Sequence, residues 1–133
     1  MANQYLHILC ENYSLLTDIQ YVEQVISGQW DSEQTQLTWQ GKTLACVNLL
    51  HLFTGNAALL SHHCIIMKKS ESDETTAVLV GRVTNVQVIQ ESEFDDLPNL
   101  DFPFNDYFDK VYIQKTDKRC IYRLKSLFAI GKS

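Results

Sequence analysis

Short runs of apolar residues, separated by polar turns, fill most of the chain. The clearest example is the segment 37–53, LTWQGKTLACVNLLHLF. It predicts a strand, a tight turn at Gln40-Gly41-Lys42, a second strand, and a helical turn that Gly55 closes. Apolar side chains fall on both faces of the second strand, which is typical of a strand in the middle of a packed β-structure. We therefore expect the other strands to be arranged around this one.

The rest of the chain predicts more short strands. Polar turns lie between 5–10 and 13–16 and between 108–114 and 120–124, so each pair predicts a β-hairpin. Segment 18–26 predicts a helical turn followed by a strand from Val22. Segment 64–67 predicts a further strand, and 76–90 predicts two strands or one bent strand, because Gly81 within it indicates a bulge, a bend or a close backbone approach. Segments 27–36, 56–63 and 68–75 predict connections, and 125–130 predicts a closing helical turn. Eight to ten short strands favour an all-β sandwich or small barrels.

Size and charge limit the possible functions. The 133 residues and 15.3 kDa fit one domain, and a net charge of -5 with a pI near 5.2 argues against nucleic acid as a partner. Segment 91–109 holds seven acidic residues and no basic ones, whereas 110–132 holds seven Lys or Arg against one Asp. These segments could bind each other within the fold or meet another chain.

The cysteines and the apolar runs predict the compartment. Cys10, Cys46, Cys64 and Cys120 are far apart and form no C-x-x-C motif. Cys46, Cys64 and Cys120 lie in apolar runs, where a free cysteine behaves as a small buried hydrophobe. Scattered, buried cysteines without a paired motif predict a reduced, cytoplasmic protein. The first residues lack the pattern of a signal peptide, and no apolar run approaches the length needed for membrane insertion.

Few residues offer catalytic chemistry. His62, His63 and Cys64 suggest a metal site, but adjacent side chains of a strand point to opposite faces, so one ion could not easily reach both histidines. Asp95 and Asp96 lack a partnered histidine, and no nucleophile elbow, P-loop or dinucleotide-binding motif is present. We therefore predict a non-enzymatic domain with no metal and no cofactor, which binds a partner. The aromatic residues could form a binding platform, although strand-face packing explains most of them.

The order of the segments resembles that of the CheW-like domain family, the coupling proteins of bacterial chemosensory arrays. The resemblance covers nearly the whole chain and rests on four ordered segments, none of which is specific by itself: Val22-Glu23-Gln24-Val25-Ile26, the hairpin 38–49, Ala77-Val78-Leu79-Val80-Gly81-Arg82-Val83, and the closing segment 121–128. The chain departs from the family pattern at four charged positions, which hold the neutral Gln24, Gln40, Asn48 and Gly81.

The resemblance implies two small five-stranded SH3-like β-barrels, interleaved along residues 1–133 and packed together with short helical turns. It also implies a non-enzymatic adaptor whose partners are a CheA-type histidine kinase and the cytoplasmic tip of a chemoreceptor, in chemotaxis or twitching motility. Matched residue by residue, the receptor-binding groove would include Val22, Gln24, Gln40, Val80 and Val83. The kinase-binding face would include Leu44, Val47 and Gly81.

Two alternatives stay open. The neutral residues at four charged positions would remove charge-assisted hydrogen bonds of about 1.5–3 kcal/mol each, so the chain could be a diverged scaffold of the same fold that binds another protein. The third hypothesis is a small enzyme or metal protein that uses His62, His63 and Cys64. The sequence does not distinguish which signal, kinase or receptor would be involved, nor the oligomeric state.

Overall fold

The structure, a computed structural model, describes residues 2–68, 74–98 and 107–125. Strands account for most of these residues. They are β1 (Ala2–Cys10), β2 (Tyr13–Asp18), β3 (Val22–Trp30), β4 (Gln36–Trp39), β5 (Lys42–Asn48), β6 (Ser61–Lys68), β7 (Thr75–Val80), β8 (Arg82–Gln90), β9 (Asp95–Asp96), β10 (Phe108–Ile113) and β11 (Cys120–Leu124). The helix α1 (Leu49–Thr54) and the single 3₁₀ turns η1 (Ile19–Tyr21) and η2 (Glu91–Glu93) complete the described elements.

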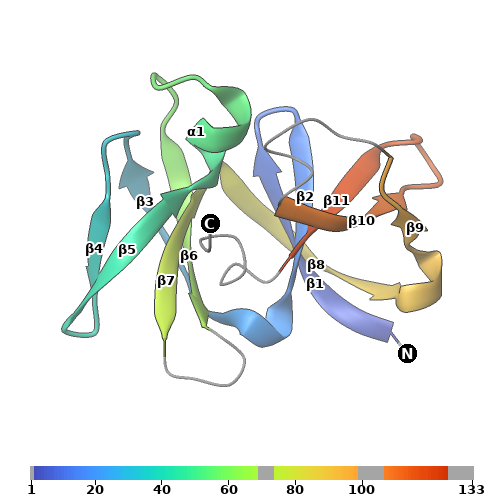
Figure 1. Cartoon of the computed structure of the whole chain (residues 1–133), viewed down its shortest axis with the longest axis horizontal. Helices are drawn as coiled ribbons and strands as arrows, with labels where there is room; N and C mark the ends of the chain where they lie inside the picture. The colour runs from blue at the N-terminus through green and yellow to red at the C-terminus, as the bar shows by residue number, and fades with distance from the viewer. Residues whose placement is uncertain (1, 69–73, 99–106, 126–133) are drawn as a thin grey trace.

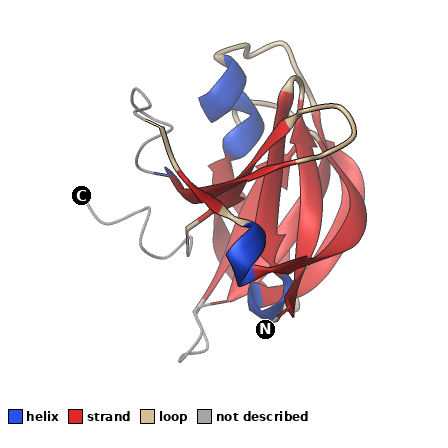
Figure 2. Cartoon of the chain, turned by 90° about the vertical axis from the view of Figure 1, so that its right-hand side faces the viewer, coloured by secondary structure: helices blue, strands red, loops and turns tan. Residues whose placement is uncertain are grey.

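The strands form two curled sheets that lie side by side (Figure 1). The six-strand lobe has the order β8-β1-β2-β11-β10-β9, and the five-strand lobe has the order β3-β6-β7-β5-β4. Pairing is antiparallel except between β11 and β2 and between β5 and β7. The chain enters the five-strand lobe through η1 and leaves it at Gly81, so the lobes are interleaved. Seen from the side of the six-strand lobe, the short helical elements lie at the ends of the strands (Figure 2).

A hydrogen bond connects the two edges of the five-strand sheet. The indole Nε1–H of Trp39, on β4, donates to the side-chain oxygen of Gln24, on β3, at 2.8 Å. Because β3 and β4 are the first and last strands of this sheet, the contact shows that the sheet curls until its edges meet. The predicted all-β class with two barrel-like lobes is confirmed, and the six-strand lobe carries the two-residue β9 in addition to five longer strands.

Three apolar clusters hold this arrangement together. One fills the six-strand lobe and one the five-strand lobe. The largest, which we call the inter-lobe core, lies between them and contains Leu6, Ile8, Cys10, Leu15, Leu49, Leu50, Phe53, Ile65, Met67, Val78, Val80, Phe108 and Leu124. Successive side chains of a strand point to opposite faces, so one strand can serve two clusters. On β7, Ala77 and Leu79 face the inside of the five-strand lobe, whereas Val78 and Val80 face the inter-lobe core.

Most of the predicted elements are confirmed. Both hairpins form, η1 precedes a strand that starts at Val22, and Gly55 ends α1 with a left-handed φ of 67°. Segment 76–90 forms two strands separated by Gly81. The predicted closing turn at 125–130 lies almost entirely outside the described residues, as do the tips of the 68–75 and 91–109 connections.

Three predictions are wrong. Segment 27–36 is not one loop, because β3 continues to Trp30 and β4 starts at Gln36. The 56–63 connection ends early, because β6 starts at Ser61. The strand at the centre of the five-strand sheet is β7, not the predicted β5. Between Ala77 and Val80 every side chain is buried, whereas Leu44 is the one fully buried side chain of β5.

Acidic and basic segments bind each other inside the six-strand lobe. The guanidinium of Arg123 donates to both carboxylate oxygens of Asp109 at 2.9 and 3.0 Å and to Glu91 at 2.8 Å. It also donates to the hydroxyl of Tyr5 at 3.3 Å and lies 4.6 Å from the ring centre of Phe94. Bidentate, partly buried pairs of this kind are stronger than exposed ones. The acidic segment therefore contacts the basic segment of its own chain.

Gly81 joins β7 to β8 where the chain passes from one lobe to the other. A Cβ atom at this position would lie 2.4 Å from the backbone oxygen of Leu9 on β1. Backbone atoms do not move aside as a flexible side chain does, so glycine allows the two lobes to approach here. This is the close backbone approach that the sequence suggested.

We predict that Gly81→Ala lowers the free energy of unfolding by about 1–3 kcal/mol, the usual range for overpacking. Gly41→Asn is the matched control, since Gly41 has a φ of 76° in open space and asparagine tolerates this conformation. Urea unfolding of both variants measures the difference. Equal stability of the two variants would contradict the proposed steric conflict with Leu9.

The four cysteines are free thiols, and their burial differs from the prediction. Cys10 and Cys64 are buried and Cys46 is partly buried, but Cys120 is exposed because its side chain points away from the cluster that Ile121 enters. Burial raises the pKa of Cys10 to about 11 and the pKa of Cys64 to about 12. Burial also raises the pKa of Cys46. These thiols are therefore protonated and unreactive in the native protein at neutral pH.

The raised thiol pKa values predict a loss of stability in alkaline solution. Above the ordinary pKa of 9.0, the unfolded chain loses its Cys10 and Cys64 protons while the native protein keeps them. The unfolded state then binds fewer protons, so the free energy of unfolding falls as pH rises, by up to about 1.4 kcal/mol per pH unit for each thiol. Between pH 9 and 11, Cys10→Ala and Cys64→Ala should each flatten this slope, whereas Cys120→Ala should not. Unfolding curves with unchanged slopes in the first two variants would contradict the account.

Candidate protein-binding surface

Five valines extend the inter-lobe core to the surface of the protein, and we call them the valine surface. Val22 and Val25 lie on β3, and Val83, Val86 and Val88 lie on β8. Val22 and Val83 are half-buried against the inter-lobe core. Val25, Val86 and Val88 are 37%, 46% and 63% exposed, respectively. Large exposed apolar side chains that continue a core are typical of a site for a protein partner.

Strand register explains why the β8 valines share one face. Val83 lies opposite Ile8 of β1, and Val86 lies opposite Leu6. Directly opposite residues of an antiparallel pair project from the same face of the sheet. Leu6 and Ile8 belong to the inter-lobe core, so Val83 and Val86 face the same side. Val88 follows two residues later and continues the row beyond the core.

The β3 valines face the inter-lobe core for the same reason. Val22 lies opposite Met67 of β6 and Val25 lies opposite Ile65, and both β6 residues belong to the core. One direct contact connects this lobe to β8. The backbone N–H of Val83 donates to Nδ1 of His63, on β6, at 3.1 Å. The two rows of valines therefore border a shared apolar floor.

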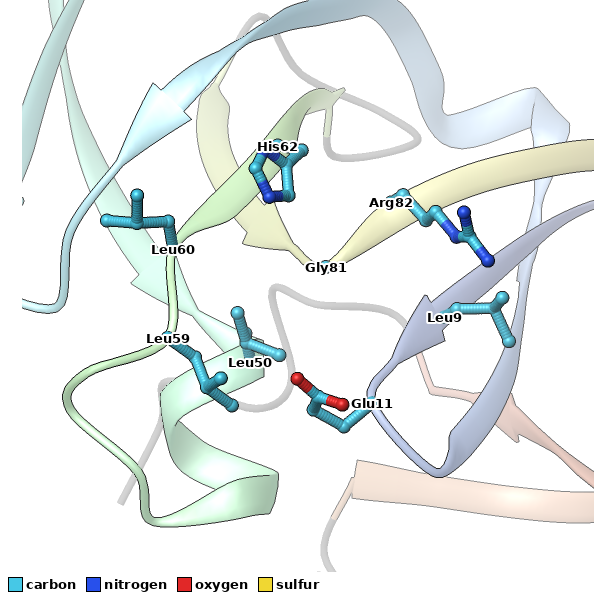
Figure 3. A pocket seen from close by; sticks show the side chains of 8 residues that line it. All are labelled: Leu9, Glu11, Leu50, Leu59, Leu60, His62, Gly81 and Arg82. Carbon is cyan, nitrogen blue, oxygen red and sulfur yellow. The ribbon is translucent and has the colours of Figure 1, made fainter.

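A pocket of about 340 Å³ opens at the seam between the lobes. Four leucines line it together with a charged and polar rim: Leu9, Leu50, Leu59, Leu60, Glu11, His62, Arg82 and the backbone of Gly81. Leu59 and Leu60 lie on one side and Leu9 and Arg82 on the other (Figure 3). The combination of apolar walls and charged rim suits a side chain of a protein partner, with the charges limiting which partner is accepted.

The residues predicted for the receptor-binding groove separate into two groups. Val22 and Val83 belong to the valine surface. Gln24 and Gln40 lie at the closure of the five-strand lobe, where Gln24 binds Trp39 and Gln40 forms the exposed hairpin turn with φ 49°. Val80 is wholly buried in the inter-lobe core, so its side chain offers no surface to a partner.

The residues predicted for the kinase-binding face are also dispersed. Leu44 is buried inside the five-strand lobe, and Val47 packs against the inter-lobe core. Gly81 contributes backbone to the seam pocket. Leu44 can therefore shape the β5 surface but cannot itself contact a partner.

Sequence reasoning missed three exposed members of the valine surface, Val25, Val86 and Val88. A signal was present, because Val86 and Val88 alternate with the polar Asn85 and Gln87. Alternation shows that two faces differ but does not show which face meets the core. The position of the other lobe decides which face of β8 is covered, and no local feature of the sequence indicates that position.

The residues of the alternative metal hypothesis, His62, His63 and Cys64, lie in different surroundings, and Cys64 is buried in the five-strand lobe. His63 accepts the hydrogen bond from Val83, and His62 points to the seam pocket. Within residues 2–68, 74–98 and 107–125, no three His, Cys, Asp or Glu side chains are grouped as metal ligands would be. In the same described segments, no helix is long and apolar enough to span a membrane.

Comparisons with known proteins connect the fold to that of a solved structure. No protein-family model matches the chain, and no curated protein matches it in sequence. In structure, the chain is similar to the crystal structure of the scaffolding protein TtCheW from Thermoanaerobacter tengcongensis, with a TM-score of 0.74. The likeness covers 100% of this chain and 95% of that one at 18% sequence identity. The chain therefore has the CheW-like fold.

Burial predicts that a charge costs far more stability at Val80 than at Val88. Val80→Asp places an unpaired carboxylate in the inter-lobe core and should cost about 3–5 kcal/mol of stability. Val88→Asp changes an exposed side chain and should cost less than about 1 kcal/mol. Urea unfolding monitored by circular dichroism measures both. If Val80→Asp were as stable as the parent chain, the assignment of Val80 to the core would be wrong.

Proposed function

We propose that the protein is a non-enzymatic adaptor that couples a chemoreceptor to a CheA-type histidine kinase in a chemotaxis or twitching-motility pathway. The observation that carries the proposal is the valine surface at the seam of a CheW-like fold. The fold likeness extends over the whole chain, and the protein it resembles is described as a scaffolding protein. The proposal places the protein in the cytoplasm, where both partners would be reached.

The valine surface suits the helical tip of a receptor. A helix that binds in a groove presents apolar residues at i, i+3, i+4 and i+7 and needs apolar side chains opposite them. Val25, Val86 and Val88 supply exposed apolar area on two strands, and the buried inter-lobe core adjoins them. We propose that the receptor helix lies along these residues, with Val22 and Val83 at its base.

The kinase would bind the other predicted surface, on the five-strand lobe. We propose a kinase-binding face around β5, where Val47 is partly exposed and Leu44 supports the strand from inside. Gly81 connects β7 to β8, so it would keep the kinase-binding face on one lobe close to the receptor-binding valine surface. Separate surfaces would let one adaptor hold both partners at once, as coupling requires.

The hydrogen bond of Gln24 favours a second candidate function. Its side chain closes the five-strand lobe by binding Trp39, and the adjacent Gln40 is neutral and exposed. A diverged scaffold that binds a different protein would not need charges at these positions. Gln40→Arg should change the affinity for kinase or receptor if the protein is a coupling adaptor. An unchanged affinity would favour the diverged scaffold.

We predict that Val25→Asp and Val88→Asp each weaken binding to a receptor cytoplasmic tip at least tenfold, which corresponds to about 1.4 kcal/mol. Ile113→Asp is the matched control, because Ile113 is a 42% exposed apolar residue on β10, in a different part of the fold. Titration calorimetry with receptor and kinase fragments from the same organism measures the effect. Parent protein that binds neither partner would overturn the proposed function, and equal losses in all three variants would overturn the proposed surface.

A further inference from the structure

Among the described residues, strand β8 has a backbone edge with no paired strand, as well as exposed side chains. It is the first strand of the six-strand lobe and pairs with β1 on one side. No other described strand pairs with its second side. The other described sheet edges are protected, since β9 has two residues and the β3 and β4 edges are connected through Trp39 and Gln24. A long free edge is a template for another strand.

The hydrogen bonds at the end of β8 show which backbone groups are free. The N–H of Gln90 donates to the carboxylate of Glu93 at 2.9 Å, so Gln90 and its partner Ala2 are not a hydrogen-bonded pair. Along an antiparallel pair of strands, hydrogen-bonded and non-hydrogen-bonded residue pairs alternate. Val88 and Val86, two and four residues earlier, therefore also point their N–H and C=O groups away from β1. The same two residues have the most exposed valine side chains.

Natural edge strands are usually protected by charge, proline or a bulge that covers them. Between Val83 and Gln90 the sequence VTNVQVIQ holds no charged residue and no proline, and its register shift against β1 lies at one end, between Val83 and Asn85. The ends of this stretch are occupied, because His63 accepts the N–H of Val83 and Glu93 accepts that of Gln90. The open edge is thus confined to the short segment centred on Gln87.

We propose that β8 pairs with β8 of a second copy of this chain, antiparallel and about a two-fold axis at Gln87. In this register Val86 of one copy lies opposite Val88 of the other. Each copy supplies two outward N–H and two outward C=O groups, so the pair forms four backbone hydrogen bonds. The four valines then meet on one face of the joined sheet, where each pair buries apolar surface.

The charges near the two ends of β8 favour a second copy of this chain as the partner of its free edge. With Val86 opposite Val88, the Arg82 end of one β8 approaches the Gln90 end of the other, where the turn η2 carries Glu91 and Glu93. Each copy thus has a basic residue at the start of β8 and acidic residues in the turn just after its end, and antiparallel pairing brings opposite charges together twice. The dimer would cover Val86 and Val88, so it would compete with a receptor helix at the valine surface. The pairing itself does not depend on the proposed function.

Sedimentation equilibrium of the full chain tests the dimer. The average mass should rise from 15.3 kDa toward twice that value as concentration increases to several hundred micromolar. Val86→Lys should abolish the rise through charge repulsion. Val88→Pro should abolish it as well, because proline removes an outward N–H and leaves the β1 hydrogen bonds in place. Ile113→Lys, on a different surface, should associate as the parent does.

Amide exchange gives a second readout that does not depend on the variants. In the dimer the N–H groups of Val86 and Val88 should become protected as concentration rises, whereas Gln87, which pairs with Tyr5, is protected at every concentration. A mass of 15.3 kDa at all concentrations would overturn the proposal. So would a dimer that persists in Val88→Pro, since it would not use this backbone edge. If the protein stays monomeric, and its binding of a receptor helix survives Val88→Pro but is lost in Val86→Lys, the proposal is also overturned. The surface would then bind a helix through its side chains and not through its backbone edge.

Discussion

The inter-lobe core is the constraint on which the rest of the structure depends. It takes residues from both lobes and from α1, and it is the largest apolar cluster of the described residues. A fully buried Val, Leu or Ile contributes about 1.5–3 kcal/mol, so neither lobe can leave this cluster without a large loss of stability. The chain crosses between lobes at η1 and Gly81, and both crossings must keep the lobes close. The fit of Gly81 against Leu9 is one consequence.

The valine surface follows from the same constraint. Where a strand lies beside the other lobe, one of its faces turns inward and the other turns toward the inter-lobe core, so the central strand β7 buries every side chain from Ala77 to Val80. On the edge strands β3 and β8, the second lobe covers the row of side chains incompletely, and Val25, Val86 and Val88 stay exposed. Arg123 and its acidic partners stabilise the six-strand lobe elsewhere. A receptor helix and a second β8 would therefore use the same residues, and their competition would link assembly to self-association.

The sequence predicted local structure well and the site only in part. Turn residues such as Gln40-Gly41 and the glycine at position 55 determine local geometry, so the hairpins and α1 could be predicted. Which strand is central depends on long-range pairing, and this is why β7 was missed in favour of β5. Family resemblance correctly indicated the fold. It could not show that Val80 is buried and Val88 exposed, because that difference depends on how far the other lobe covers β8.

The central claim is that the valine surface binds the helical tip of a receptor. The most direct measurement is a methyl NMR titration of the valine-labelled protein with a receptor cytoplasmic hairpin from the same organism. The account predicts that the methyl signals of Val25, Val83, Val86 and Val88 shift together while that of Val111, buried in β10, stays unchanged. Shifts confined to residues away from β3 and β8, or no shift at saturating receptor, would contradict it.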